Sequence, residues 1–236
     1  MREESIIIVT GASRGVGRET VISLVRDHGK EVLAIARSAQ ALDALSAELK
    51  DAPGRLRTLT ADLTSSRLPE DLSEALGERR VSALVNNAGL LLKRDFGQWT
   101  AEDMDHLYQV NVVVPLLLVQ VLLDRFTGTP TAHVVNIGSM GGVRGTTKFP
   151  GLLGYSVSKG GLVTLTECLA EELKERGVRV NCLSLGAVDT EMLREAFPGF
   201  EAQVSAAQVG AFVAQFSLEG HNLFNGKVLE VALGTP

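Results

Sequence analysis

The sequence predicts an α/β fold: one doubly wound, parallel sheet of seven strands with helices on both faces. Two observations predict it. Short runs rich in β-branched residues alternate with longer segments that carry apolar residues at helical spacing, along nearly the whole chain. The strand-like runs, such as SIIIVT at 5–10, are apolar on both faces, as strands of a covered parallel sheet are. The 236 residues contain no internal repeat, low-complexity tract or linker, so we expect one domain over residues 1–236.

The strands are predicted from their composition and their boundaries. Each is a short run dominated by aliphatic or β-branched residues, and each is bounded by a turn or by a segment of helical period. In chain order they cover residues 5–10, 31–36, 55–63, 82–89, 132–139, 178–186 and 227–233. The segment 187–204 has no clear period, and Pro198-Gly199 interrupts it, so a helical lid and a plain loop are both open there.

The helices are predicted between these strands from the period of their apolar residues. In chain order they cover residues 17–29, 39–51, 68–78, 100–126, 154–177 and 205–218. Gly29 lies near the C-cap of the first helix, and Thr100 opens the fourth, with acids in its first turn. An apolar run at 112–119 is broken by Pro115 and is shorter than the ~18 residues of a membrane span, so we interpret it as a buried helix.

Composition excludes several classes of protein. The net charge is −5 and no basic run is present, so nucleic acid is not an expected partner. Two cysteines form no disulfide framework, and the N-terminal segment does not resemble a signal peptide. These features favour a cytoplasmic protein that does not associate with membranes. The four histidines form no metal-ligand pair, so no metal site is expected.

A glycine-rich segment, TGASRGVG at 10–17, connects the first strand to the first helix. Gly11 would turn the chain, Gly15 would let the backbone approach a phosphate, and Gly17 would let the helix pack closely. Main-chain N–H groups at a helix N-terminus hold a pyrophosphate well. The spacing differs from the general G-x-G-x-x-G fingerprint, so a plain glycine-rich turn is the alternative.

The end of the second strand predicts the choice of nucleotide. In this position an acidic residue binds a ribose 2′-hydroxyl, whereas an arginine accommodates a 2′-phosphate. The sequence has Ala36 there, followed by Arg37, and Arg14 in the glycine-rich segment could approach the same phosphate. Two guanidinium groups and no carboxylate favour NADP(H) over NAD(H), unless both arginines are merely solvated. Asp62 is placed to accept a hydrogen bond from the adenine amino group, and a simple turn or cap role is the alternative.

Tyr155 and Lys159 are four residues apart in a predicted helix, so their side chains share one face. A phenol beside an ammonium group can act as a proton donor with a lowered pKa. The pair alone is equally compatible with an ordinary solvated helix surface.

Six motifs together resemble those of the short-chain dehydrogenase/reductase family. They occur in the same order as in the family and at nearly the same spacing. They are TGASRGVG (10–17), ADL (61–63), NNAG (86–89), Asn111, NIGS (136–139) and YSVSK (155–159). The resemblance covers essentially the whole chain. Within the family, the chain is similar to the 3-oxoacyl-carrier-protein reductases and their relatives. It implies a Rossmann-like single domain.

The resemblance implies the catalytic roles. Tyr155 would be the general acid in carbonyl reduction, and Lys159 would lower its pKa together with the oxidised nicotinamide and would hydrogen-bond the nicotinamide ribose. Ser139 would hydrogen-bond the substrate oxygen. Asn111 would hold water in a proton relay to Lys159, with a purely local backbone contact as the alternative.

The resemblance also implies a set of cofactor contacts. Asn86, Asn87 and Gly89 would tie the fourth strand to its neighbours and leave room beside the cofactor, and Val188 and Thr190 would hold the nicotinamide carboxamide. The full implied set is Gly11, Ser13, Arg14, Gly15, Val16, Gly17, Arg37, Asp62, Leu63, Asn87, Ala88, Gly89, Tyr155, Lys159, Gly186, Val188 and Thr190.

The sequence departs from the family in three places. Ser139 and Tyr155 are sixteen residues apart, a longer spacing than the family usually has, and the extra residues lie in the loop at 141–154. Leu185-Gly186 stands where the family usually has Pro-Gly, and the lid after Thr190 is short. We expect a less predictable pocket, partly hydrophobic, with Leu91, Phe149, Leu153, Met192 and Phe197 near it.

The leading hypothesis is an NADPH-dependent reductase of a ketone, an aldehyde or an acyl β-ketone that also oxidises the corresponding alcohol. A non-catalytic, NADP-binding regulatory protein is the alternative. A nucleotide-sugar epimerase or dehydratase usually needs a longer C-terminal domain. A homodimer or homotetramer is expected, because the helices at 100–126 and 154–177 carry more apolar residues than one sheet face requires.

Overall fold

A computed structural model describes residues 5–126 and 131–233; residues 1–4, 127–130 and 234–236 of the predicted domain lie outside this description. Seven parallel strands form the main sheet, in the order β3-β2-β1-β4-β5-β6-β9. In chain order the strands are β1 (Ser5–Thr10), β2 (Glu31–Ala36), β3 (Arg55–Thr60), β4 (Arg80–Asn86), β5 (Ala132–Ser139), β6 (Val178–Leu185) and β9 (Val228–Val231). The predicted seven-stranded parallel sheet is therefore confirmed.

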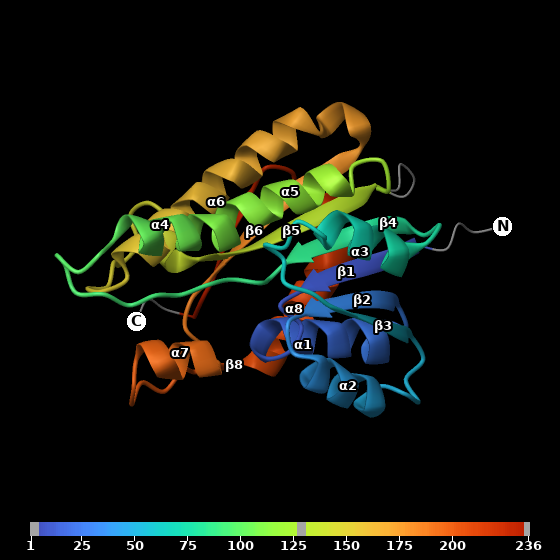
Figure 1. Ribbon diagram of the computed structural model, residues 1–236, viewed down its shortest axis with the longest axis horizontal. Coiled ribbons are helices and arrows are strands. Elements are labelled where there is room, and N and C mark those ends of the chain that lie inside the picture. The colour runs from blue at the N-terminus through green and yellow to red at the C-terminus, as the bar shows by residue number, and fades with distance from the viewer. Residues whose placement is uncertain (1–4, 127–130, 234–236) are drawn as a thin grey trace.

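Helices cover both faces of the sheet, as Figure 1 shows. One face carries α1 (Gly15–Ile22), α2 (Ala39–Glu48) and α8 (Ala206–Glu219). The other face carries α3 (Leu68–Leu76), α4 (Ala101–Tyr108), α5 (Val114–Val121) and α6 (Leu153–Glu172). The described residues also form three short 3-10 turns: η3 (Met140–Gly142), η4 (Lys174–Arg176) and η5 (Gly220–Asn222).

The alternation of side chains along each strand divides the core into two layers. In β1, Ile7 and Val9 pack against the α1, α2 and α8 layer, whereas Ile6 and Ile8 pack against the α3, α5 and α6 layer. All four are buried. Complete burial of one such side chain contributes about 1.5–3 kcal/mol to the free energy of folding. This two-sided burial explains why the strand runs in the sequence are apolar without alternation.

The predicted helix at 100–126 is three segments rather than one. A π-helical turn, η2 (Gln109–Val113), lies between α4 and α5, and the helix ends at Val121. Pro115 explains the irregularity, because it has no N–H to donate to the carbonyl of Asn111, four residues earlier. A second π turn, η1 (Ser23–Asp27), likewise ends the first helix. By length and composition the described run Ala101–Val121 could cross a bilayer, a test that core helices of globular proteins also pass.

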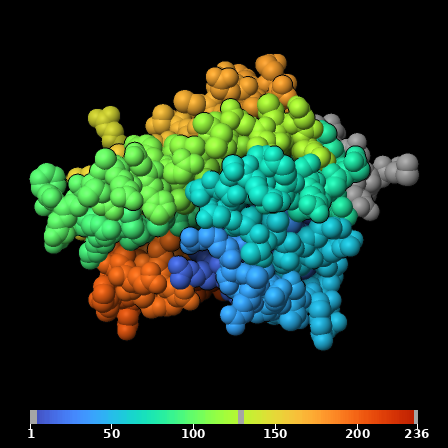
Figure 2. Space-filling view, viewed as in Figure 1, coloured from blue at the N-terminus to red at the C-terminus, as the bar shows by residue number. Residues whose placement is uncertain are grey.

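The segment 187–204 forms a small lid. Its ends are held together by two short parallel strands, β7 (Val188–Asp189) and β8 (Val204–Ser205), and the helix α7 (Glu191–Ala196) lies between them. The open choice between a helix and a loop is thus decided in favour of a short helix. In the space-filling view the orange lid lies beside the blue glycine-rich segment (Figure 2).

Candidate active site

A cavity of about 750 Å³ lies where the carboxyl ends of the strands meet the lid. The sheet order reverses between β1 and β4, and a crevice at such a switch point is where open α/β sheets bind ligands. Of the predicted cofactor contacts, all but Gly17 line this cavity. Of the four predicted catalytic residues, Ser139, Tyr155 and Lys159 line it, and Asn111 does not.

The glycine-rich segment adopts a backbone that requires glycine at two positions. Gly11 has a φ of 66° and Gly15 a φ of 57°, in the left-handed region that favours glycine. A side chain at Gly11 would lie 2.8 Å from the Cα of Ala88, and one at Gly17 would overlap the side-chain amide of Asn87. Gly17 therefore serves close packing behind the cavity, which is why it does not line the cavity.

Thr10 and Asn87 join the glycine-rich segment to the end of β4. The Asn87 side chain donates to the main-chain oxygens of Thr10 (2.9 Å) and Gly11 (3.2 Å). The Thr10 hydroxyl accepts from the main-chain N–H groups of Asn87 (3.1 Å) and Ala88 (3.0 Å). These bonds fit the tying role that was predicted for Asn87. Thr10, which is buried, was not predicted from the sequence, because a threonine ending a strand has no distinctive pattern.

Asp62 makes the turn contacts that the sequence left as an alternative. Its Oδ1 accepts from the main-chain N–H of Thr64 (2.9 Å) and from the Thr64 hydroxyl (2.7 Å). These hydrogen bonds, aided by the charge of Arg37, lower the pKa of the carboxyl group. Both bonds use one oxygen, so Oδ2 is not engaged by them. His106 on α4, not predicted from the sequence, also lines the cavity and acts electrostatically on Asp62.

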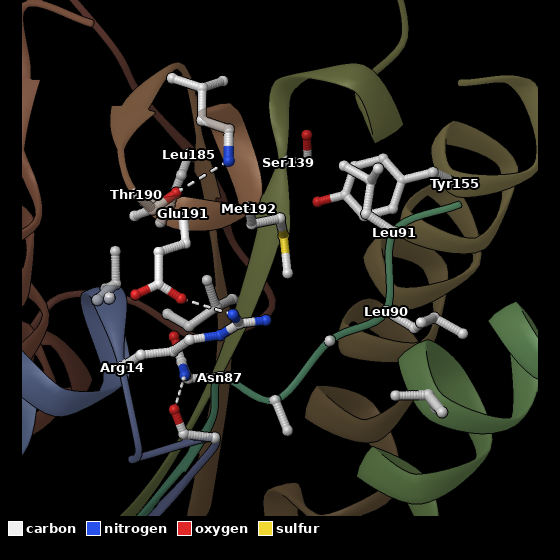
Figure 3. Close-up of a pocket in the computed structure, with 18 of the residues that line it drawn as sticks. Arg14, Asn87, Leu90, Leu91, Ser139, Tyr155, Leu185, Thr190, Glu191 and Met192 are labelled. Carbon is white, nitrogen blue, oxygen red and sulfur yellow. Dashed lines mark hydrogen bonds and ion pairs between the residues drawn. The ribbon is translucent and has the colours of Figure 1, made fainter. Parts of the chain in front are cut away.

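The Arg14 side chain extends from the glycine-rich segment to the lid. Its guanidinium contacts Glu191 at 2.6 Å and Glu195 at 4.0 Å, and the Glu191 contact is drawn in Figure 3. The sequence offered no sign of these partners, because the lid had no clear period. Both members of the Arg14–Glu191 pair are more than half exposed, so the pair contributes at most about 1 kcal/mol, and a competing anion can replace it.

Ser139 and Tyr155 form the core of the reactive end. Ser139 ends β5 and Tyr155 lies in the first turns of α6, so the sheet edge and the helix N-terminus bring them together. Their hydroxyl groups lie near each other in Figure 3. Burial raises the pKa of Tyr155, and the nearby Ser139 hydroxyl lowers it by less. The sequence argument counted the positive charges of Lys159 and of a bound, oxidised nicotinamide, and it did not include the cost of burial.

Lys159 is buried, with an exposed fraction of 4%, so the alternative of a solvated Tyr-Lys pair is wrong. Its Nζ donates to the main-chain oxygen of Ile137 at 2.8 Å and lies 5.9 Å from the centre of the Tyr155 ring. Burial lowers the pKa of Lys159 to about 8. Tyr155 and Lys159 thus share one helix face, as predicted, and the burial of the site disfavours the charged form of the lysine.

Asn111 is buried in the π turn and holds the loop that follows β4. Its Oδ1 accepts from the main-chain N–H of Leu90 (2.8 Å), and its Nδ2 donates to the Leu90 oxygen and the Ser158 hydroxyl (2.9 Å each). The alternative of a backbone contact is realised, although with a distant segment. A side chain added at Gly89 would lie 3.4 Å from both Asn111 Oδ1 and Lys159 Nζ, so Gly89 leaves the space between them open.

Gly186 joins the end of β6 to the end of β9. The N–H of Gly186 donates to Val231 at 3.0 Å, and a side chain at Gly186 would lie 2.6 Å from the Cβ of Ala232. Thr190 caps α7 by accepting from the N–H of Leu193 at 3.2 Å. Among the described residues, no group of three or more His, Cys, Asp or Glu could hold a metal ion.

The sequence model of the short chain dehydrogenase family matches residues 5–199. A 3-oxoacyl-[acyl-carrier-protein] reductase of Synechocystis is 30% identical over 189 residues, which are 79% of this chain and 75% of that protein. The L-xylulose reductase of Caenorhabditis elegans is 32% identical over 80% of this chain and 74% of its own.

Solved structures agree with the fold over nearly the whole chain. The Pseudomonas aeruginosa RhlG/NADP active-site complex has a TM-score of 0.85 at 26% identity and covers 99% of each chain. A blue fluorescent protein from a metagenomic library, in complex with NADPH, has a TM-score of 0.84 at 27% identity and covers 97% of this chain and 96% of its own.

Proposed function

Since this chain belongs to the short-chain dehydrogenase/reductase family, we propose that it is an NADPH-dependent oxidoreductase that reduces a ketone, an aldehyde or an acyl β-ketone to an alcohol. One observation carries the proposal. The hydroxyls of Ser139 and Tyr155 and the buried amine of Lys159 meet at one end of a cavity whose other end is a glycine-rich, nucleotide-type turn.

The residues present fit a dinucleotide. The left-handed glycines Gly11 and Gly15 keep the wall beside α1 free of side chains, where main-chain N–H groups can face phosphates. Asp62 Oδ2 can accept from an adenine amino group, and Val188 and Thr190 line the far end, where a carboxamide would be held. When bound, NADPH supplies a hydride. Two of the structural relatives were solved in complex with NADP or NADPH, which supports the choice of cofactor.

The preference for NADP(H) over NAD(H) rests on charge. Ala36, at the end of β2, offers no carboxylate to a ribose 2′-hydroxyl. Arg37 is exposed beside it, and Arg14 lies at the glycine-rich segment, so two guanidinium groups are available for a 2′-phosphate. Binding of the phosphate to Arg14 would replace its exposed contact with Glu191.

Tyr155 is the proposed proton donor. Because burial raises its pKa, the phenol keeps its proton at neutral pH and can give it to an oxygen that gains negative charge. Lys159 stabilises the resulting phenolate when the amine is charged. Ser139 donates a hydrogen bond to the same substrate oxygen and stabilises its developing charge. Asn111 positions the loop at Leu90 beside Lys159, and we propose this role alongside the water relay that the family resemblance implies.

We also propose a cytoplasmic homodimer or homotetramer. The exposed faces of α4, α5 and α6 carry large apolar side chains. These are Tyr108, Leu117, Val121, Leu153 and Val157, each at least 37% exposed. A second copy of the chain would remove them from water. Light scattering that gives a monomer at working concentration would contradict this assembly.

The test is NADPH oxidation by the purified chain with a panel of ketones, aldehydes and β-ketoacyl thioesters, in parallel with Tyr155→Phe. Turnover that depends on Tyr155 supports the proposal. Normal turnover by Tyr155→Phe on any substrate would show that the assigned acid is wrong. Tight NADP binding without turnover across the whole panel would favour the non-catalytic regulator.

A further inference from the structure

We propose that the substrate is an uncharged carbonyl compound with an apolar ring or branched chain beside its carbonyl, and that Phe149 and Phe197 select it. The inference rests on the proposed carbonyl reductase function and adds the substrate class and the residues that set it.

The first step is the lining of the cavity beyond the reactive hydroxyls. Apolar side chains line the cavity together with Ser139 and Tyr155, and they come from two loops, from η3 and from the lid. They are Leu91, Met140, Phe149, Leu152, Met192 and Phe197. In Figure 3 the Met192 side chain reaches from α7 toward the space that the two hydroxyls share. The sequence named Leu153 for this wall, but Leu153 is exposed outside the cavity and Leu152 lines it instead.

The second step is the distribution of charge. Among the described residues that line the cavity, each charged or titratable side chain other than Tyr155 has a partner outside the apolar wall. Arg37 and His106 act on Asp62 at the adenosine end, and Arg14 is paired with Glu191. Lys159 is hydrogen-bonded to Ile137. A substrate carboxylate or phosphate at the apolar wall would therefore lose its hydration, and it would have to displace one of these partners, or the Ala196 oxygen that Lys93 contacts, to gain a cation.

The third step is that two aromatic side chains of this wall join the long loop at 141–154 to the short lid. The Phe149 and Phe197 rings pack edge to face, with centres 5.3 Å apart and planes at 74°. Phe149 comes from the loop that is longer than in the family, and Phe197 follows directly after α7. Two of the three departures noted in the sequence, the long loop and the short lid, thus meet in this contact.

Lys93 holds the lid side of this aromatic contact. Its Nζ donates to the main-chain oxygen of Ala196 at 2.9 Å and lies 5.5 Å from the centre of the Phe197 ring. Nearby, the N–H of Arg94 donates to the Gly151 oxygen at 3.0 Å, which joins the same loop to the segment carrying Phe149. The two rings are therefore held in place, and a rigid aromatic wall discriminates substrates by shape.

The experiment compares specificity constants for reduction by NADPH with the full chain. Cyclohexyl methyl ketone tests the apolar ring, 4-acetylcyclohexanecarboxylate adds one charge to it, and acetone lacks the ring. We expect kcat/KM for the carboxylate to be lower than for the parent ketone by at least about a hundredfold. Equal values for the two ring compounds would overturn the inference.

The variants are Phe149→Ala and Phe197→Ala, with Phe96→Ala as the matched control, since Phe96 is 92% exposed and does not line the cavity. We expect the kcat/KM ratio of the cyclohexyl ketone to acetone to fall by about tenfold in each variant and to stay unchanged in the control. NADPH affinity should not change in any of them. An unchanged ratio, or an equal loss on both ketones, would show that these rings do not select the substrate.

A binding measurement separates this inference from the proposed function. With saturating NADP, 1-cyclohexylethanol should raise the Tm of the wild-type chain and of Phe96→Ala, but not of Phe149→Ala or Phe197→Ala. That pattern without any turnover would refute the reductase and keep the apolar site. Turnover that depends on Tyr155, without that pattern, would refute the aromatic wall alone.

Discussion

The Nζ of Lys159 lies 5.9 Å from the centre of the Tyr155 ring and donates to the main-chain oxygen of Ile137 at 2.8 Å. The Ile137 oxygen, on strand β5, therefore orients the amine, which is buried beside the phenol. Burial lowers the pKa of Lys159 to about 8, which corresponds to a desolvation cost of about 3 kcal/mol.

Lys159→Met tests this cost against the proposed role. Methionine removes a penalised charge but leaves the Ile137 oxygen without its donor, a loss of about 1–3 kcal/mol. We expect the free energy of unfolding at pH 7 to change by less than about 2 kcal/mol, while kcat/KM falls at least about a hundredfold. Urea unfolding and NADPH oxidation measure the two quantities. A fully active Lys159→Met enzyme would contradict the role assigned to the amine.

Tyr155→Phe and Ser139→Ala should reduce kcat/KM far more than they weaken NADPH binding. Loss of a general acid typically costs a factor of about 10²–10⁴, and loss of one hydrogen-bond donor to a developing oxyanion about 10²–10³. The phenylalanine ring keeps the packing of Tyr155, so the Tm should be close to that of the wild type. Fluorescence titration with NADPH supplies the control, since a variant that no longer binds the nucleotide would speak for misfolding.

Ala36→Asp should shift the nucleotide preference toward NADH. A carboxylate at the end of β2 would accept from a ribose 2′-hydroxyl and repel a 2′-phosphate. We expect the ratio of kcat/KM for NADPH to that for NADH to fall by at least about a hundredfold. Arg37→Ala should lower the same ratio by about tenfold, since it removes one exposed cation. A ratio that stays constant in both variants would mean that another residue reads the phosphate.

Glu191→Gln should strengthen NADPH binding, because Arg14 no longer has to leave a carboxylate. The pair is exposed, so the expected gain in affinity is only about two- to fivefold, and salt should reduce it. Glu201→Gln, an exposed acid in the same lid, is the matched control. Isothermal titration at low and high salt measures both, and weaker binding by Glu191→Gln would reverse the assignment.

His133 should make the fold sensitive to acid. The buried ring contacts the Ser217 oxygen (3.2 Å) and the Asn181 amide (3.0 Å), and burial lowers the pKa of His133 to about 4. The nearby His221 ring, 5.5 Å away, has a lowered pKa as well. Between about pH 6.5 and 4 the unfolded chain binds the proton that folded His133 does not, so stability falls as the pH falls through this window.

The expected loss from His133 is about 3 kcal/mol in total, at no more than about 1.4 kcal/mol per pH unit. His133→Gln should weaken this dependence, and His28→Gln, at a half-buried bend, is the matched control. Urea unfolding at pH 7, 5.5 and 4.5 measures the slope. Parallel pH profiles for wild type and His133→Gln would contradict the assignment.

The sheet could be predicted from the sequence because each strand is buried on both faces and so has a continuous apolar run. The helix boundaries could not be predicted as well, since a π turn has no propensity signature. Pro115 was recognised as an interruption, but only the geometry shows that it acts at Asn111. Strand β3 ends at Thr60, earlier than expected, because the residues after it turn toward Asp62 and its bonds with Thr64.

The nucleotide and catalytic residues could be proposed because they lie in short ordered motifs at strand ends. Their neighbours were missed where the contact joins distant segments. Thr10 acts through Asn87, and Glu191 acts through Arg14, so neither forms a local pattern. The burial that raises the pKa of Tyr155 depends on the tertiary packing around the phenol, which spacing does not encode.

The two-residue ladder that pairs Val188 with Val204 and Asp189 with Ser205 brings the two ends of the segment between them together. A stretch whose ends already meet can be replaced by another of different length without disturbing the strands that carry it. Grafting designs that cut after Asp189 and rejoin before Val204 would therefore exchange helix α7, Phe197 and the predicted cofactor contact Thr190 as one cassette, and leave the main sheet intact.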